Sequence, residues 1–191
     1  MKRRVLLEGL LAFALTLPLA RHGDAHTPYR QWKILRQRFL LVHSTRSDPV
    51  SDDIAGRIVE VFDRVLPQAK AMVARAPDEQ RVASLMTTGQ AVLAVMHADQ
   101  AADLYLSRGA FGDYDGEQLR AVVAIDDHLL VSVASFPRHH AWLVTSALIE
   151  NGAGPAVRLP DDVNAGGTVP LHDGAAAFAS GEPLDPGRLC G

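Results

Sequence analysis

Three apolar runs, each followed by a helical pattern, constrain the fold of this chain more than any other feature. The runs are 39–42, 71–74 and 91–96. Because they do not alternate with polar residues, they are typical of strands covered on both faces, as in a parallel sheet. Helical patterns follow at 49–65 and at 77–88, and a third runs through Ala102 and Tyr105 with Asp99 as its expected N-cap. Strands and helices alternating at this spacing predict right-handed parallel crossovers, with helices on both faces of the sheet.

The chain after these units predicts an antiparallel strand pair. Residues 119–125 and 129–133 are apolar and are separated only by Asp126-Asp127-His128, which favours a tight reversal. Three segments are predicted to follow: a helix from Pro137 to near Gly152, a loop over 151–169 and a short helix over 175–178. The sequence therefore predicts an α/β fold with three αβα layers. Its sheet is open and mostly parallel, with about five strands, one of them antiparallel, and 39–42 lies central among the first three.

The N-terminal segment has the pattern of an export signal. Met1-Lys2-Arg3-Arg4 is basic, residues 5–20 are mostly apolar, and the small residues Gly23 and Ala25 suit a signal peptidase. We expect a signal peptide over 1–25 and a periplasmic protein that does not span the membrane once processed. The remaining chain divides into an N-terminal extension (26–37), one α/β domain (38–180) and a flexible tail (181–191). A buried N-terminal helix is the alternative interpretation.

Charge and cysteine content exclude other classes. The formal net charge is −3 and no face gathers Lys and Arg, so nucleic acid is not an expected partner. Cys190 is the single cysteine, so no internal disulfide forms and the fold depends on its apolar core.

The order of several segments resembles a known family. The segments are Arg81 to Met96, Leu119-Arg120-Ala121-Val122 and Pro170-Leu171-His172-Asp173-Gly174-Ala175-Ala176. Together, in pieces over about 38–180, they are similar to the TRAP-associated extracytoplasmic immunogenic (TAXI) solute-binding proteins, which have the type 2 periplasmic binding-protein fold. The resemblance implies solute capture in a cleft between two lobes, and delivery to a membrane transporter.

Two departures from that family limit what the resemblance implies. The run 129–133 passes almost directly into the helix at Pro137, so the second lobe is missing and a single lobe offers half a cleft. The family's Gly- and Ser-rich loop after the first strand is also replaced by Ser44 to Val50. The family's anion contacts therefore cannot be carried over residue by residue.

Ligands of open parallel sheets bind at the carboxyl ends of strands. That rule selects a set of ligand-binding candidates: Ser44, Thr45, Arg46, Ser47, His97 and Asp99. Helix amides together with the Arg46 guanidinium predict a site for a small anionic molecule such as a carboxylate. The alternative is a solvated loop in which Arg46 pairs with Asp48 or Asp52.

One histidine is a candidate metal ligand. Cleavage after Ala25 would leave His26 with a free amine and an imidazole, a nitrogen pair that suits copper(II). The alternative interpretation is that cleavage exposes His26 by chance in a flexible end of the chain, where it has no role. A copper site would make the chain an accessory protein with a redox-protein partner.

No catalytic pattern is present. There is neither a His-Glu-x-x-His helix nor a Gly-x-Ser-x-Gly turn, and no enzyme activity is predicted. The leading interpretation is a solute-binding-like protein that captures a small anion or docks on a transport partner. The others are the copper-binding accessory protein and an interaction protein without a ligand.

Overall fold

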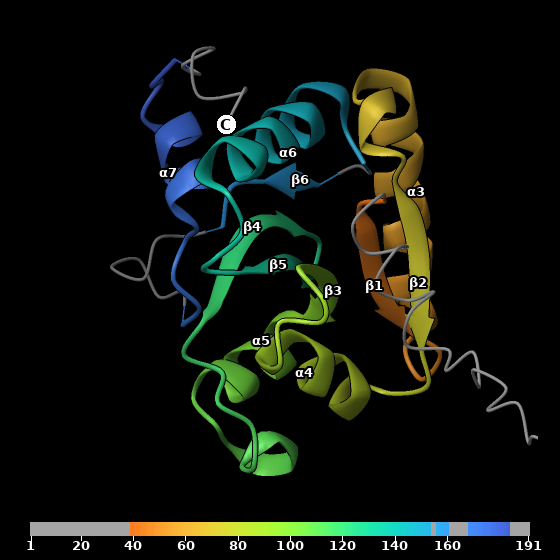
Figure 1. Ribbon diagram of the computed structural model, residues 1–191, viewed down its shortest axis with the longest axis vertical. Coiled ribbons are helices and arrows are strands. Elements are labelled where there is room, and N and C mark those ends of the chain that lie inside the picture. Colours follow the sequence, from red (N-terminus) through yellow and green to blue (C-terminus); the bar gives the residue numbers. More distant parts are fainter. Residues whose placement is uncertain (1–38, 154–155, 161–167, 184–191) are drawn as a thin grey trace, which may run out of the picture. The chain divides into compact units, whose positions relative to one another are not determined.

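The computed structural model (Figure 1) describes residues 39–153, 156–160 and 168–183, all within a unit that spans 34–191. The predicted signal peptide, N-terminal extension and most of the C-terminal tail lie outside the described residues. The strands are β1 (Leu41–Thr45), β2 (Met72–Ala76), β3 (Leu93–His97), β4 (Leu119–Ile125), β5 (His128–Val133) and β6 (Val157–Arg158). The helices are α3 (Pro49–Val65), α4 (Glu79–Thr87), α5 (Ala98–Tyr105), α6 (Arg138–Asn151) and α7 (Asp173–Ala179), with 3-10 turns η1 (Pro67–Ala69) and η2 (Gly109–Phe111).

The strands form one mixed sheet in the order β2-β1-β3-β5-β4-β6. β1 lies between β2 and β3 and is parallel to both, so the predicted α/β class and the predicted order of the first three strands are confirmed. The predicted pair 119–125 and 129–133 is confirmed as the antiparallel strands β4 and β5. β5 is inserted between β3 and β4, and it is antiparallel to both.

The prediction of about five strands with a single antiparallel one was wrong. Val157 and Arg158 form a sixth strand, which pairs antiparallel with Ile125 and Ala124 of β4. The segment 151–169, expected to be a loop, therefore contributes to the sheet. Two residues are too few to show a period of two, and Gly and Pro surround them, so this strand has no sequence signal.

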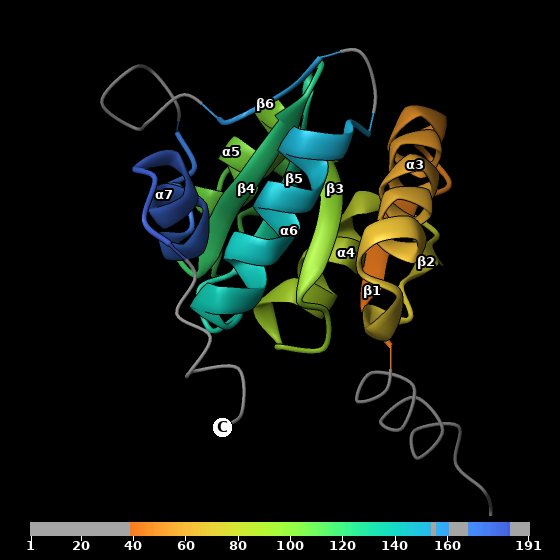
Figure 2. The same ribbon diagram turned by 90° about the horizontal axis from the view of Figure 1, so that it is seen from above.

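Helices cover both faces of the sheet. Figure 2 shows α3, α6 and α7 on one face, and α4 and α5 on the other. The chain runs from β1 out to β2 through α3, then back past β1 to β3 through α4. With both crossovers right-handed, this reversal places α3 and α4 on opposite faces. It also makes the gap between β1 and β3 a topological switch point, where ligands of such sheets bind.

The helix α3 shows how local sequence fixes these positions. Asp48 caps it, because Oδ1 of its carboxylate accepts hydrogen bonds from the amides of Val50 (3.0 Å) and Ser51 (3.2 Å). Pro49 occupies the first turn, where no amide partner is needed. Ile54, Ile58 and Phe62 recur at helical spacing and are fully buried against the sheet.

The helix α5 begins differently from the prediction. Asp99 was expected to cap it, but the N-cap is His97, whose Nδ1 accepts a hydrogen bond from the Asp99 amide at 3.3 Å. Asp99 lies in the first turn, where a negative charge is favourable because of the helix dipole. The imidazole therefore replaces the carboxylate as the acceptor at this helix end.

Among the described residues, none of the helices combines the length and apolar character that crossing a membrane requires.

Candidate functional site

The carboxyl ends of β1 and β3 meet the β4–β5 turn at one edge of the sheet, called here the strand-end edge. His97, the last residue of β3, pairs in register with His128, the first residue of β5. The turn between β4 and β5 is tight because Asp126 adopts a left-handed conformation (φ 54°), which Asp tolerates better than most residues. Two segments far apart in sequence thus place titratable side chains side by side.

His128 is the centre of a hydrogen-bonded cluster at this edge. Its side chain is buried, and each ring nitrogen faces a carboxylate: Nδ1 lies 2.6 Å from Oδ1 of Asp127, and Nε2 lies 2.8 Å from Oδ2 of Asp48. Both bonds form when each nitrogen carries a proton to donate. The hydrogen bond from His128 is also the main reason that the pKa of Asp127 lies below its usual value.

His97 extends this cluster towards α5. Its Nε2 lies 3.4 Å from Oδ2 of Asp127, and its ring packs edge to face on that of His128, with 5.4 Å between centroids. About a third of the His97 side chain is exposed, whereas His128 is almost fully enclosed. Of the two histidines, His97 is the one that a ligand can reach.

Of the four predicted residues 44–47, Ser44 and Thr45 are buried at the end of β1, and Arg46 and Ser47 lie in the loop that follows. All four are at the same edge, but three of them already donate hydrogen bonds within the chain. The Ser44 hydroxyl donates to Asp52 (3.0 Å). The hydroxyls of Thr45 and Ser47 donate to Oε1 of Glu79, at 3.3 and 2.9 Å. These side chains orient carboxylates of the protein itself.

In the alternative interpretation of this loop, the expected exposure of Arg46 agrees with the structure, but its expected ion pair was wrong. Arg46 pairs with neither Asp48 nor Asp52: Asp48 bonds to His128, and the Arg75 guanidinium lies 2.6 Å from Asp52. The hydrogen bond from Arg75 is the largest influence on Asp52 and lowers the pKa of that carboxyl. Arg46 is exposed, and within the described part of the chain no acidic side chain forms an ion pair with it.

The helix amides that were expected to attract an anion already hold one. Oδ1 of Asp48 accepts from the amides of Val50 and Ser51, so the carboxylate occupies the position that a bound anion would take. Arg46 is therefore the residue of the predicted set whose donors remain available to an external ligand, whereas the partly exposed His97 already accepts from the Asp99 amide through Nδ1 and faces Asp127 through Nε2. Asp99 lies beyond them, with its side chain almost fully exposed.

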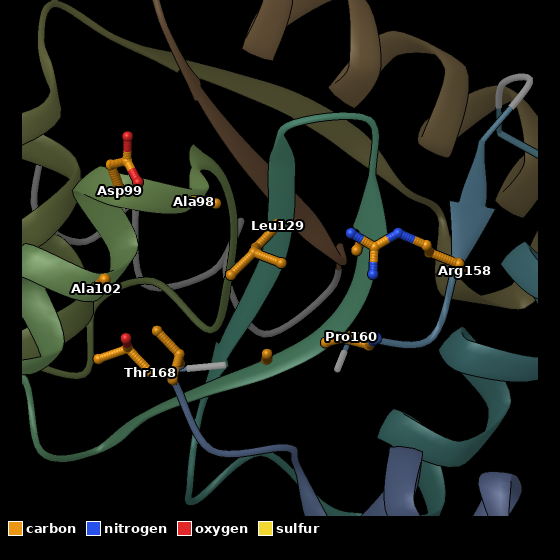
Figure 3. Close-up of a pocket in the computed structure, with 10 residues that line it drawn as sticks. Ala98, Asp99, Ala102, Leu129, Arg158, Pro160 and Thr168 are labelled. Atoms are coloured by element: carbon orange, nitrogen blue, oxygen red, sulfur yellow. The ribbon is translucent and has the colours of Figure 1, made fainter. Parts of the chain in front are cut away.

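A second feature adjoins the strand-end edge (Figure 3). It is a half-open cavity of about 210 Å³ between α5, the strands β4 and β5, and the described residues around 160 and 168, and it is called here the alanine cavity. Its lining consists of Ala98, Asp99, Ala102, Ala121, Ala124, Leu129, Arg158, Pro160, Thr168 and Val169. Asp99 is the predicted site residue that reaches it.

Several residues of the strand-end edge and the alanine cavity were not among the site residues predicted from the sequence. Asp127 and His128 were interpreted as turn residues that needed only a backbone explanation, although three titratable groups in a row were a signal. Arg158 was missed because it lies in a segment expected to be a loop. Two strand residues between Gly- and Pro-rich segments gave no pattern by which it could have been found.

The predicted copper ligand His26 lies outside the described residues. Within the described part of the chain, no group of three or more His, Cys, Asp or Glu side chains is placed to hold a metal ion. Comparison with known proteins found no family model that matches this chain and no curated protein that matches it.

Proposed function

We propose that this protein is an exported binding module, similar to a single lobe of the TAXI solute-binding proteins, that captures a small carboxylate and presents it to a membrane transport partner. The observation that supports the proposal is the convergence of the β1–α3 loop, the end of β3 and the β4–β5 turn at the β1/β3 switch point. In sheets of this kind ligands bind in that position.

The proposed ligand contacts are those that the chain leaves available at this edge. Arg46 supplies a planar fork of donors, and the partly exposed His97 adds Nε2, which a ligand carboxylate would share with Asp127. The hydrogen bond between His128 and Asp48 holds the loop that carries Arg46 against the turn beside His97. Ser44, Thr45 and Ser47 fix the loop through Asp52 and Glu79, and so act on the ligand indirectly.

Binding at a single lobe is expected to be weak. Water screens an exposed arginine, so we expect dissociation constants of roughly micromolar to millimolar. A partner that covers the strand-end edge would exclude this water and strengthen each contact. No catalytic role is proposed for the strand-end edge.

A calorimetric titration with glutamate and succinate tests the ligand. Arg46→Gln should weaken binding about tenfold or more through loss of a charge-assisted pair. Arg64→Gln is the matched control, because Arg64 is exposed in the last turn of the same helix that Asp48 caps. If neither acid binds, or if Arg46→Gln binds like the unmodified protein, the proposed site is wrong.

Export is tested separately by intact-mass measurement on protein recovered from the periplasm. The proposal expects loss of residues 1–25, with His26 as the first residue. Protein that stays in the cytoplasm and still begins at Met1 would contradict it.

A further inference from the structure

We infer that the alanine cavity is a second binding site, which takes a short apolar monocarboxylate with its chain among the alanines and its carboxylate on Arg158. The inference extends the proposed function, because it adds a site and a ligand class to the same binding module. It rests on three observations: four alanines line the cavity, the Arg158 side chain reaches it, and no other Lys or Arg is among the lining residues.

The cavity exists because four alanines face one another. Ala98 and Ala102 are four residues apart in α5 and therefore lie on one face of that helix. Ala121 and Ala124 of β4 would point to opposite faces of a regular strand, since they are three residues apart. A bulge between Ala121 and Val123 inserts one residue, so both alanines line the same cavity.

The bulge in β4 is itself an indication of a binding site. Bulges are common beside binding sites, where they redirect a side chain. Here the redirected residue is Ala124, whose strand partner is Arg158. Figure 3 shows the Arg158 side chain extending from β6 towards β4 at the mouth of the cavity.

The lining determines the ligand class. Seven of the ten lining residues are Ala, Leu, Pro or Val, so the part of the cavity away from Arg158, Asp99 and Thr168 suits an apolar group. Arg158 is the cationic side chain in that set, and its guanidinium matches a carboxylate in two parallel hydrogen bonds. Arg158 also has an interaction within the chain, which a ligand carboxylate would share or replace. The Thr168 hydroxyl is a further donor at the rim.

The same lining disfavours a dicarboxylate. A second carboxylate would meet either alanine and leucine side chains or Asp99, which carries the same charge. The volume of about 210 Å³ equals the share of about seven water molecules at ~30 Å³ each, so the ligand has about six or seven non-hydrogen atoms. Isovalerate fits this size, and isovaleramide has the same shape without the charge.

The test is an NMR titration of the full chain with isovalerate, isovaleramide and succinate. Isovalerate should shift the amide signals of residues 98–102, 121–129 and 157–159, and isovaleramide should bind at least tenfold more weakly. Arg158→Gln should weaken isovalerate binding about tenfold. Ala102→Leu should abolish it by filling the cavity, while the melting temperature stays the same or rises.

The outcomes separate this inference from the proposed function. Arg46→Gln should leave the isovalerate-induced shifts at 98–102, 121–129 and 157–159 unchanged, because Arg46 is not part of the cavity lining. If isovalerate causes no shifts at these residues, or if folded Ala102→Leu protein binds it as the unmodified chain does, the inference is overturned. In that case, dicarboxylate binding that depends on Arg46 would still support the proposed function. Conversely, isovalerate binding at the cavity without any dicarboxylate binding at Arg46 would support the cavity site alone.

Discussion

Nε2 of His128 lies 2.8 Å from Oδ2 of Asp48, although the two residues are 80 positions apart in the chain. The other carboxylate oxygen of Asp48 caps α3 through the amides of Val50 and Ser51. One side chain therefore joins three elements: the loop after β1, the start of α3 and the β4–β5 turn. The strand-end edge depends on this carboxylate more than on any of the residues expected to bind ligand.

Asp48→Ala should consequently be costly. It removes the cap of α3, worth about 1 kcal/mol, and it removes a charged hydrogen-bond partner of the buried His128, worth about 1.5–3 kcal/mol. We expect the free energy of unfolding in urea to fall by about 3 kcal/mol. Asp53→Ala is the control: Asp53 is in the same helix, is exposed and pairs with Arg57, so its loss should cost under about 1 kcal/mol. Equal effects of the two changes would show that the Asp48–His128 contact contributes little.

Much of the fold could be predicted because its signals are local. The apolar runs of β1 and β3, the cap and proline before α3, and the short joint between β4 and β5 each specify an element within a few residues. The strand β6 and the parallel bridge between Leu171 and Ala121 have no such signal, because one or two residues cannot show a period.

The candidate site was harder to predict, because its contacts depend on tertiary structure. Nothing near Asp48 in the sequence indicates His128, and a turn residue such as Asp127 has a sufficient backbone explanation. The alanine cavity was hidden for a different reason. A strict period of two places Ala121 and Ala124 on opposite faces of β4, and only the bulge brings them together.

Acid should weaken the fold partly through Asp127. Its pKa is lowered in the folded protein, mainly by the hydrogen bond from His128, so Asp127 contributes stability above its unfolded pKa of about 3.9. That contribution is lost as the pH falls through the folded pKa, which lies lower. Asp127→Asn should therefore flatten the decline in urea midpoint below about pH 4. If the urea midpoint of this variant falls below pH 4 as steeply as that of the unmodified protein, the role of the His128 contact is contradicted.

His172 should add a second pH dependence at milder acidity. It is buried, its Nε2 donates to the Phe136 carbonyl (3.0 Å), and its Nδ1 accepts from the Gly174 amide (3.0 Å), so the neutral ring satisfies both bonds. Burial is the main reason that its pKa is lowered. The stabilising contribution is complete above the unfolded pKa of about 6.5, and it is lost as the pH falls through the folded pKa.

The measurement for His172 compares urea midpoints at pH 7.5 and pH 5. His172→Asn keeps a side-chain acceptor for the amide of Gly174 but cannot take up a proton, so its midpoint should change less between the two values. The pKa of His140 is also lowered by burial, so His140 contributes to the same pH response. The variant His140→Gln measures that contribution separately from the contribution of His172. A full pH response in His172→Asn would assign the effect to other groups.

The contact between α6 and α7 provides a last test, in which the same substitution has opposite effects at two glycines. A Cβ on Gly174 would lie 2.2 Å from the Arg138 carbonyl oxygen and 2.7 Å from the Trp142 amide nitrogen. Both atoms belong to the backbone of α6, so they can move only if the helix moves. Gly174→Ala must therefore push α7 away from α6. We expect a loss of about 1–3 kcal/mol in the free energy of unfolding. In α3, a Cβ on Gly56 meets nothing within 4 Å, so Gly56→Ala should gain about 0.5–1 kcal/mol from helix propensity. Urea unfolding of both variants checks the pair, and a stabilised Gly174→Ala protein would mean that α7 does not pack on α6 this closely in solution.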